Sequence, residues 1–178
     1  MKDYVTEAIV LGLRSYRETD RMVDFFTKDF GRITAKVAAG RKPLSKFSPH
    51  LDVLNLVTLR LVKKENFTVT DVLIKNRFPL LRKKLGSLSR ALELAYIIKV
   101  FAPLQAVDLN LWHSLIRVFE KTFIDFGFFL KIFGYDPREA RCAVCGNKEI
   151  SSFFLGDHSY LCVNCRTKFP SSELLLIR

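Results

Sequence analysis

The first 77 residues alternate between apolar and polar positions, which is the period of a β-strand with one buried face. Ile33, Ala35 and Val37, for example, are separated by polar side chains. Val, Ile, Thr and Phe dominate the alternating runs, and turn residues separate them. These runs predict strands at residues 4–13, 21–27, 32–39, 51–62 and 67–74. Strands with such short connections indicate a small barrel or sandwich.

Beyond Phe78 the apolar period becomes helical. Leucine and alanine recur every three or four residues over 81–95, and Pro103 marks the end of this helical stretch. Asp108 is a candidate N-cap for the next helix. Apolar residues at the same spacing over 112–133 predict one helix of about 25 residues. We interpret its aromatic stripe as a packing face rather than as a ligand-binding surface.

The changes in pattern predict an α+β protein with four parts. They are a β domain (1–77), a helical domain (78–140), a cysteine-bearing module (141–170) and a C-terminal tail (171–178). The tail has two serines and a glutamate before a run of apolar residues, which predicts the start of a helix. No internal repeat or low-complexity segment interrupts this order.

The composition is that of a folded protein that binds polyanions. The chain has 178 residues, of which 49% are hydrophobic and 26% charged, and its net charge is +11. Such a charge attracts nucleic acid first and anionic membrane second. The sequence contains no complete signal peptide and no apolar run of about 18 residues. We therefore expect no membrane segment and a cytoplasmic location.

Four cysteines stand in two matched pairs near the C-terminus. Cys142 and Cys145 are separated by two residues, as are Cys162 and Cys165, and sixteen residues lie between the pairs. This spacing is one of those that zinc sites use. Two thiolates three positions apart in a tight turn can both reach one ion at about 2.3 Å. We therefore predict one structural Zn²⁺ held by all four cysteines.

Other interpretations of the cysteines account for the pattern less well. Disulfides are disfavoured in a reducing cytoplasm, and a lone redox pair requires no second pair. A catalytic zinc site needs an open position, which four thiolates do not leave. His158 is a spare ligand within the module, although with four cysteines available we expect it at the surface. Between the cysteine pairs, residues 150–161 predict a hairpin that turns at Gly156 and Asp157.

The segment between Phe30 and Leu51 contains five basic residues and no acid. Glycine and proline in its centre indicate a loop, on which lysines and arginines are well placed to contact phosphates. A serine hydroxyl can add an uncharged phosphate contact, and Phe47 or the earlier Tyr16 can stack on unpaired bases. The predicted nucleic-acid-binding residues are Arg32, Lys36, Arg41, Lys42, Ser45, Lys46 and Phe47. The alternative is a charged loop that is only solvated. The absence of acids and the positive net charge favour nucleic-acid binding over this alternative.

Three segments of the chain resemble the RecO family of bacterial DNA repair proteins. Residues 7–21 (EAIVL to YRETDR) resemble the family's first strand and its turn into the second. Residues 31–42 (GRI to AAGRK) are similar to a family segment that ends in a glycine-basic loop. Residues 133–146 (FGYDP to RCAVCG) resemble the approach to its zinc module. Family members continue with helices after the second cysteine pair, so the resemblance is to a variant with a short C-terminus.

The resemblance implies an N-terminal five-stranded OB-fold barrel, a helical domain and a zinc finger. It implies a protein that binds single- and double-stranded DNA and anneals complementary strands. It further implies that the protein acts with RecR to help load RecA onto DNA coated by single-strand-binding protein, whose tail it contacts. Such a mediator is not an enzyme, and it lies in the cytoplasm at the nucleoid.

Two other functions stay open on the sequence. A zinc-ribbon protein that binds RNA or the ribosome would use the same basic β surface. A metal-dependent nucleic-acid enzyme is disfavoured, because the four-thiolate site is closed and no acid-base set accompanies it. The histidines are scattered along the chain, and no phosphate-binding glycine loop is present.

Overall fold

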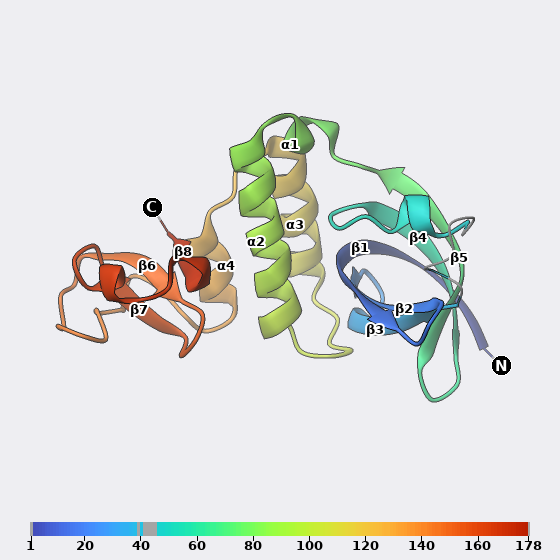
Figure 1. Ribbon diagram of the computed structural model, residues 1–178, viewed down its shortest axis with the longest axis horizontal. Coiled ribbons are helices and arrows are strands. Elements are labelled where there is room, and N and C mark those ends of the chain that lie inside the picture. The colour runs from blue at the N-terminus through green and yellow to red at the C-terminus, as the bar shows by residue number, and fades with distance from the viewer. Residues whose placement is uncertain (1, 39, 41–45, 178) are drawn as a thin grey trace. The chain divides into compact units, whose positions relative to one another are not determined.

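The computed structural model describes residues 2–38, 40 and 46–177. The chain forms two compact units, Met1–Ile124 and Asp125–Arg178, and Figure 1 traces it from the blue N-terminus to the red C-terminus. The described part of the first unit holds a β-barrel and helices, and the second unit holds the cysteines. The domain boundaries expected after residues 77, 140 and 170 stay predictions.

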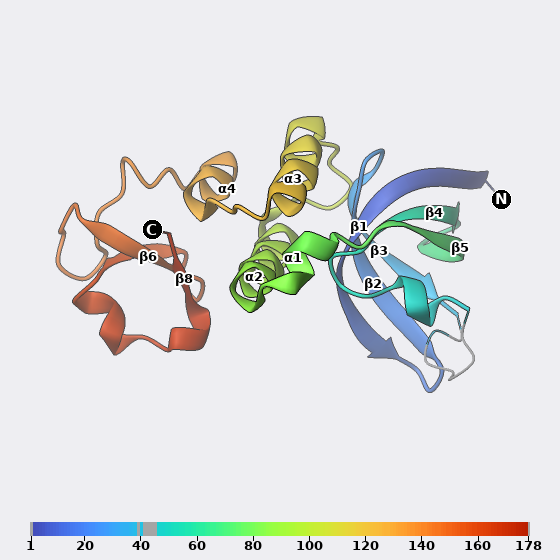
Figure 2. The same ribbon diagram turned by 90° about the horizontal axis from the view of Figure 1, so that it is seen from above.

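The first unit is built on a closed barrel of five strands. The strands are β1 (Lys2–Tyr16), β2 (Asp20–Thr27), β3 (Gly31–Val37), β4 (Leu56–Lys63) and β5 (Phe67–Asn76). Neighbours follow the order β1-β2-β3-β5-β4, and β1 also pairs with β4 to close the barrel. All pairs are antiparallel except β3 with β5. Figure 2 shows these strands curling around one another. The closed barrel of five strands is that of an OB-fold, which confirms the predicted fold class.

Alternation along the strands fills the barrel with apolar side chains, as predicted. Ile33, Ala35 and Val37 of β3 are buried in it, whereas the polar residues between them stay partly exposed. Phe25 of β2 and Leu59 of β4 lie in the same core. Fully burying one such large side chain is worth about 1.5–3 kcal/mol, so this core is the main source of the barrel's stability.

The fourth strand begins later than the sequence predicted. Among residues 51–55, Leu51 and Leu54 are almost inaccessible to solvent, but neither belongs to β4. Leu54 has a positive φ of 74°, and its backbone N–H donates a hydrogen bond to the Val10 carbonyl at 2.8 Å. The chain therefore turns at these residues before it enters β4.

Helices follow the barrel in the first unit. They are α1 (Pro79–Lys83), α2 (Leu85–Phe101) and α3 (Leu109–Lys121), and a 3-10 turn, η1 (Ser48–His50), precedes β4. Helix α2 ends before Pro103, as predicted. The Asp108 carboxylate caps α3 by accepting a hydrogen bond from the Leu111 backbone N–H at 2.9 Å, which confirms the predicted cap. None of the described helices is both long and apolar enough to cross a membrane.

The prediction of one long helix that includes residues 112–133 is wrong. Helix α3 stops at Lys121, because Thr122 adopts left-handed backbone angles with a φ of 58°. A separate helix, α4 (Phe126–Ile132), begins after Asp125, whose carboxylate caps the first turn at 3.3 Å. Both helices have the same apolar spacing, so periodicity alone does not reveal the break.

An ion pair fastens α2 to the outside of the barrel. The Asp24 carboxylate on β2 is nearly buried and lies 3.0 Å from the Lys99 ammonium of α2. The Thr34 hydroxyl donates a hydrogen bond to the same carboxylate at 2.6 Å. Lys99 passes over Gly12 of β1, where a Cβ would lie 3.3 Å from the ammonium nitrogen. The missing side chain of Gly12 thus leaves Lys99 its path to Asp24.

Replacing Lys99 by methionine is expected to lower the free energy of unfolding by about 2–3 kcal/mol. The substitution keeps the apolar stem but leaves the buried Asp24 carboxylate without its cation. Urea denaturation followed by circular dichroism measures the loss. Lys75→Met is the matched control, since Lys75 pairs with Glu7 at the barrel surface. Equal losses in the two variants would contradict a special contribution from the buried pair.

The loop between α2 and α3 docks on the edge of β3. The Gln105 backbone N–H donates to the Arg32 carbonyl at 2.8 Å, and the Arg32 Nε–H donates to the Ala102 carbonyl at 2.6 Å. The Lys63 ammonium of β4 donates to the Gln105 side chain at 2.8 Å. A parallel bridge between Arg32 and Leu104 completes the contact. The loop backbone therefore extends the sheet beyond β3 and joins the helices to the barrel.

The second unit contains α4 and a small three-stranded sheet of order β7-β6-β8. Its elements are β6 (Ile150–Phe154), β7 (Ser159–Cys162), η2 (Cys165–Lys168), η3 (Ser171–Glu173) and β8 (Leu174–Leu176). The antiparallel β6–β7 pair is the predicted hairpin. The helix start predicted at the C-terminus is limited to η3, because Leu175 is buried opposite Phe153 and its strand pairs with β6. Pairing with β6 satisfies backbone groups that a short helix would leave open.

Candidate metal centre and nucleic-acid interface

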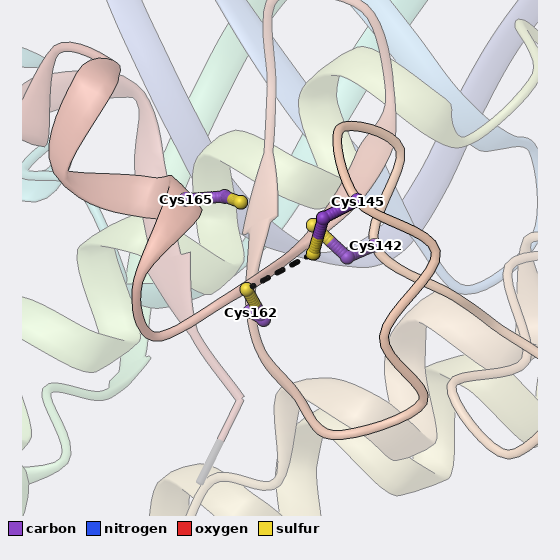
Figure 3. A group of neighbouring side chains, drawn as sticks. All are labelled: Cys142, Cys145, Cys162 and Cys165. Carbon is purple, nitrogen blue, oxygen red and sulfur yellow. Dashed lines mark hydrogen bonds between the residues drawn. The ribbon is translucent and has the colours of Figure 1, made fainter.

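Separate parts of the second unit bring the four cysteines together. Cys142 and Cys145 lie in the turn before β6, Cys162 ends β7, and Cys165 begins η2. All four Sγ atoms lie within 4.8 Å of one another. Figure 3 shows the sulfur atoms gathered around a common centre. Cys145 is exposed and the other three are buried, so the cluster sits at the edge of the unit with one side toward solvent.

Backbone hydrogen bonds shape the first cysteine pair into a tight turn. The Gly146 N–H donates to the Cys142 carbonyl at 2.8 Å, and the Cys142 N–H donates to the Asn147 carbonyl at 2.8 Å. Gly146 has a φ of 73°, in the left-handed region that glycine enters without strain. The Ala143 N–H donates to the Tyr160 carbonyl at 2.9 Å, which ties the turn to β7.

Hydrogen bonds within the cluster move the pKa values of Cys142 and Cys165 in opposite directions. Burial acts to raise the pKa of the Cys142 thiol, but hydrogen bonds from the surrounding backbone outweigh it and lower that pKa to about 6. Hydrogen bonds with the thiols of Cys162 and Cys145 raise the pKa of Cys165 to about 12. A bound cation would stabilise the thiolate form of these cysteines.

A tetrahedral zinc ion fits this set of donors. Zn–S bonds of about 2.3 Å place neighbouring sulfur atoms of a tetrahedron about 3.8 Å apart. The Sγ atoms of Cys145 and Cys162, joined by the dashed line in Figure 3, lie 3.7 Å apart. Thiolates select soft ions such as zinc, and four of them leave no open position for a substrate. The geometry therefore suits a structural ion rather than a catalytic one.

His158 lies outside the cysteine cluster. Its Nδ1 atom is 3.2 Å from the Tyr135 hydroxyl, and its ring stacks on Phe153 with centroids 6.4 Å apart. Among the described residues, the four cysteines are the group whose ligand atoms come close enough to share a metal ion. His158 therefore packs on the hairpin instead of completing the cluster.

Two of the predicted nucleic-acid-binding residues are held by contacts within the first unit. Lys36 of β3 forms an ion pair with Asp20 of β2 at 2.9 Å. Arg32 donates its Nε–H to the Ala102 carbonyl and so joins the barrel to the helices. Both side chains stay partly exposed. Their roles in nucleic-acid binding stay predictions, and Arg32 has in addition a structural role that the sequence did not indicate.

Lys46 and Phe47 lie together at the end of the basic segment. The Lys46 ammonium is 5.1 Å from the centre of the Phe47 ring. Phe47 is half-buried and packs against the barrel core, so only part of its ring faces outward. The other predicted residues of this segment, Arg41, Lys42 and Ser45, lie outside the described residues.

Comparisons with known proteins reveal the relatives of this chain. Residues 1–77 match the family model for the N-terminal part of recombination protein O. The DNA repair protein RecO of Rhodopirellula baltica is 27% identical over 187 aligned positions, which span 95% of this chain and 68% of the relative. RecO of Caldanaerobacter subterraneus subsp. tengcongensis is 27% identical over 189 positions, which span 98% of this chain and 76% of the relative. Over most of its length, the chain is therefore similar to RecO proteins.

The RecO relationship extends beyond the barrel. RecO of Heliobacterium modesticaldum is 30% identical over 156 aligned positions, which span 82% of this chain and 57% of that relative. An alignment that spans 98% of this chain includes the helices and the cysteine-bearing unit. The part matched by the RecO N-terminal family model ends at residue 77, one position after β5 ends at Asn76.

Sequence reasoning missed the residues that join the barrel to the helices of the first unit. Asp24 and Lys99 meet only because α2 lies against β1 and β2. One signal was available: Asp24 interrupts the apolar run of β2, between Val23 and Phe25. An acid in such a run requires a partner when the strand is buried on both faces, and the partner here comes from a distant segment.

Proposed function

We propose that this chain is a RecO-type protein that binds single- and double-stranded DNA in recombination and repair, and that it anneals complementary strands. The observation that carries the proposal is a closed OB barrel that matches the RecO N-terminal family and includes a basic segment without acids between Phe30 and Leu51. Its relatives bear the name DNA repair protein, which supports the same assignment.

The physical basis for annealing is the neutralisation of phosphate charge. Two DNA strands repel each other through their phosphates, and lysine and arginine side chains that bind phosphates reduce this repulsion and release counterions. The net charge of +11 supplies the required cations. Phosphate contacts carry no base information, so the paired strands themselves provide the specificity. We therefore expect annealing of any complementary pair of strands.

We infer further that the protein is a mediator without chemical turnover. With RecR it helps load RecA onto DNA coated by single-strand-binding protein, and it contacts the tail of that coating protein. The support for these partners is the similarity of the chain to RecO proteins. We assign no residue of this chain to them.

The cysteine cluster in this proposal holds one structural zinc ion. Cys142, Cys145, Cys162 and Cys165 supply the four thiolates. A bound ion supplies a crosslink between the turn before β6, the end of β7 and the start of η2. A unit of this size buries too little apolar surface to be stable by itself, and the crosslink supplies the missing stability.

An annealing assay tests the proposed function. Two complementary labelled oligonucleotides are expected to pair faster with the protein than without it, and the gain is expected to shrink as salt rises. Equal pairing rates with and without protein would contradict the mechanism. A matched RNA pair in the same assay tests the alternative, because a clear preference for RNA would favour an RNA- or ribosome-associated protein.

Arg41→Ala and Lys42→Ala are each expected to weaken DNA binding equally on all sequences and to lower the salt slope by about one unit. The prediction rests on the acid-free segment of the sequence. Fluorescence anisotropy at several salt concentrations measures the slope. Arg60→Ala is the matched control, since Arg60 is an exposed cation on β4 of the same barrel. If a variant that carries both substitutions binds DNA at low salt as tightly as the wild type, the DNA site lies elsewhere.

A further inference from the structure

The outer face of β1, β2 and β3 has a part covered by helices and a part that is open. On the covered part, Phe26 of β2 packs against Trp112 of α3 with ring centroids 6.3 Å apart. Next to it, Asp24 of β2 is paired with Lys99 of α2. Helices therefore occupy much of the face on which OB-folds commonly bind oligonucleotides. A ligand on this face must use the part beyond Asp24.

The open part lies at the tip of the β1–β2 hairpin. Side chains alternate along a strand, so Arg14 and Tyr16 share the outer face with Gly12, the residue that lies under α2. Arg14 is opposite Met22 and Tyr16 is opposite Asp20 in the hairpin register. Both Arg14 and Tyr16 are exposed. Figure 2 shows the tip of this hairpin projecting away from α2 and α3.

Tyr16 has the surroundings of a stacking platform. Its side chain is 40% exposed, and the Arg17 guanidinium lies 5.3 Å from the centre of its ring. Arg17 has a φ of 54°, so the chain reverses at this residue while its side chain stays beside Tyr16. An exposed ring next to a guanidinium can take an unpaired base and the phosphate beside it. Because Glu18 also lies in this turn, the ring rather than the net charge distinguishes the site.

The register also brings the hairpin beside the basic segment. Strand β3 ends at Val37, which is opposite Arg21 of β2, one residue from the pair that closes the hairpin. The acid-free segment continues directly from Val37. Lys36 pairs with Asp20 at the same end of the strands. Lys36, in the described start of the acid-free segment, therefore lies at the hairpin end of the barrel.

We propose that the tip of the β1–β2 hairpin is a binding site for single-stranded DNA, with an unpaired base stacked on Tyr16 and phosphates bound by Arg14 and Arg17. The assignment rests on the proposed DNA-binding function and adds the place of contact and the strand form that it selects. In a duplex the faces of each base are covered by neighbouring base pairs, so a stacking side chain selects unpaired strands. Phosphate contacts alone make no such selection.

A tryptophan at the hairpin tip tests the stacking directly. The chain's one tryptophan, Trp112, is 3% exposed, so Tyr16→Trp adds a fluorophore that DNA can reach. Single-stranded oligo(dT) is expected to quench the added fluorescence, and a duplex of the same length to quench it far less. Tyr96→Trp is the matched control, because Tyr96 is 52% exposed but lies on α2. Its fluorescence is expected to stay unchanged on addition of oligo(dT).

Binding constants provide the second readout. Tyr16→Ala is expected to bind oligo(dT) about tenfold more weakly, as for the loss of one stacked base, with the salt slope of the wild type because no charge is removed. Tyr16→Phe retains the ring and is expected to retain the affinity. Arg14→Gln is expected to lower the salt slope by about 0.7 units, the value for one phosphate of a single strand.

The outcomes separate this site from the proposed function. If the wild-type chain binds oligo(dT), but Tyr16→Ala binds equally well and Tyr16→Trp is not quenched, the hairpin site is wrong and DNA binding stands. If the wild-type chain does not bind oligo(dT) at low salt, both are wrong. Thermal unfolding by circular dichroism checks that each variant folds, and Tyr16→Trp and Arg14→Gln decide the matter if the alanine variant does not.

Discussion

Replacing Cys142 by serine is expected to eliminate bound zinc and to unfold the second unit. The zinc content should fall from about one ion per chain to nearly none, because a serine hydroxyl stays protonated at neutral pH and does not replace a thiolate. Cys142 is buried in a small cluster in which Leu161 accompanies the cysteines. Zinc binding at structural sites is worth about 10–16 kcal/mol, far more than burial of one leucine supplies.

Val144→Ser is the matched control for the loss of the ligand. Val144 lies between Cys142 and Cys145 and is 49% exposed, so the control places the same hydroxyl in the same turn without removing a thiolate. Metal analysis after dialysis and far-ultraviolet circular dichroism before and after a chelator compare the two variants. A wild-type chain without zinc, or a Cys142→Ser chain with full zinc content, would overturn the metal assignment.

Gly31→Ala is expected to lower the free energy of unfolding of the first unit by about 3 kcal/mol, for two reasons that add. Gly31 begins β3 with a φ of 63°, and a residue with a Cβ is strained there by about 1–2 kcal/mol. A Cβ at this position would lie 1.9 Å from the Ala106 carbonyl oxygen. The α2–α3 loop would have to move from the edge of β3, and such overpacking costs about 1–3 kcal/mol.

Gly86→Ala provides the contrast to Gly31→Ala. Gly86 lies in the first turn of α2, where a Cβ meets nothing within 4 Å, so we expect a gain of up to about 1 kcal/mol. Trp112 fluorescence during urea denaturation follows the first unit, because Trp112 packs on Phe26 of the barrel. A Gly31→Ala midpoint equal to that of the wild type would show that the barrel tolerates displacement of the loop.

Features that depend on neighbouring residues were accessible from the sequence. The alternation of Ile33, Ala35 and Val37 predicted the buried face of β3, because a strand places every second side chain on the same side. Asp108 predicted the start of α3, because a capping carboxylate accepts a hydrogen bond from the backbone N–H three residues later. The cysteine spacing predicted the cluster for the same reason, since each pair forms its own turn.

The surroundings of the basic residues were not accessible in this way. The segment around Lys36 was selected because it contains no acid. In the fold, however, Lys36 forms an ion pair with Asp20 of the neighbouring strand. Arg32 likewise finds its acceptor in the Ala102 carbonyl, far along the chain. Charge counted along a sequence therefore identifies a basic segment but not which of its cations stay available to a ligand.

Spacing along the chain was enough to specify which side chains fill the barrel and which thiols lie together in each cysteine pair, because both follow from local backbone geometry. Contacts between distant segments were needed for the rest. The apolar run Leu174–Leu176 became a strand because β6 offered it a pairing edge. The hairpin tip at Tyr16 became the open end of the barrel face because α2 and α3 cover the remainder. Hydrogen-bond partners and burial at these positions are supplied by residues that no local pattern connects to them.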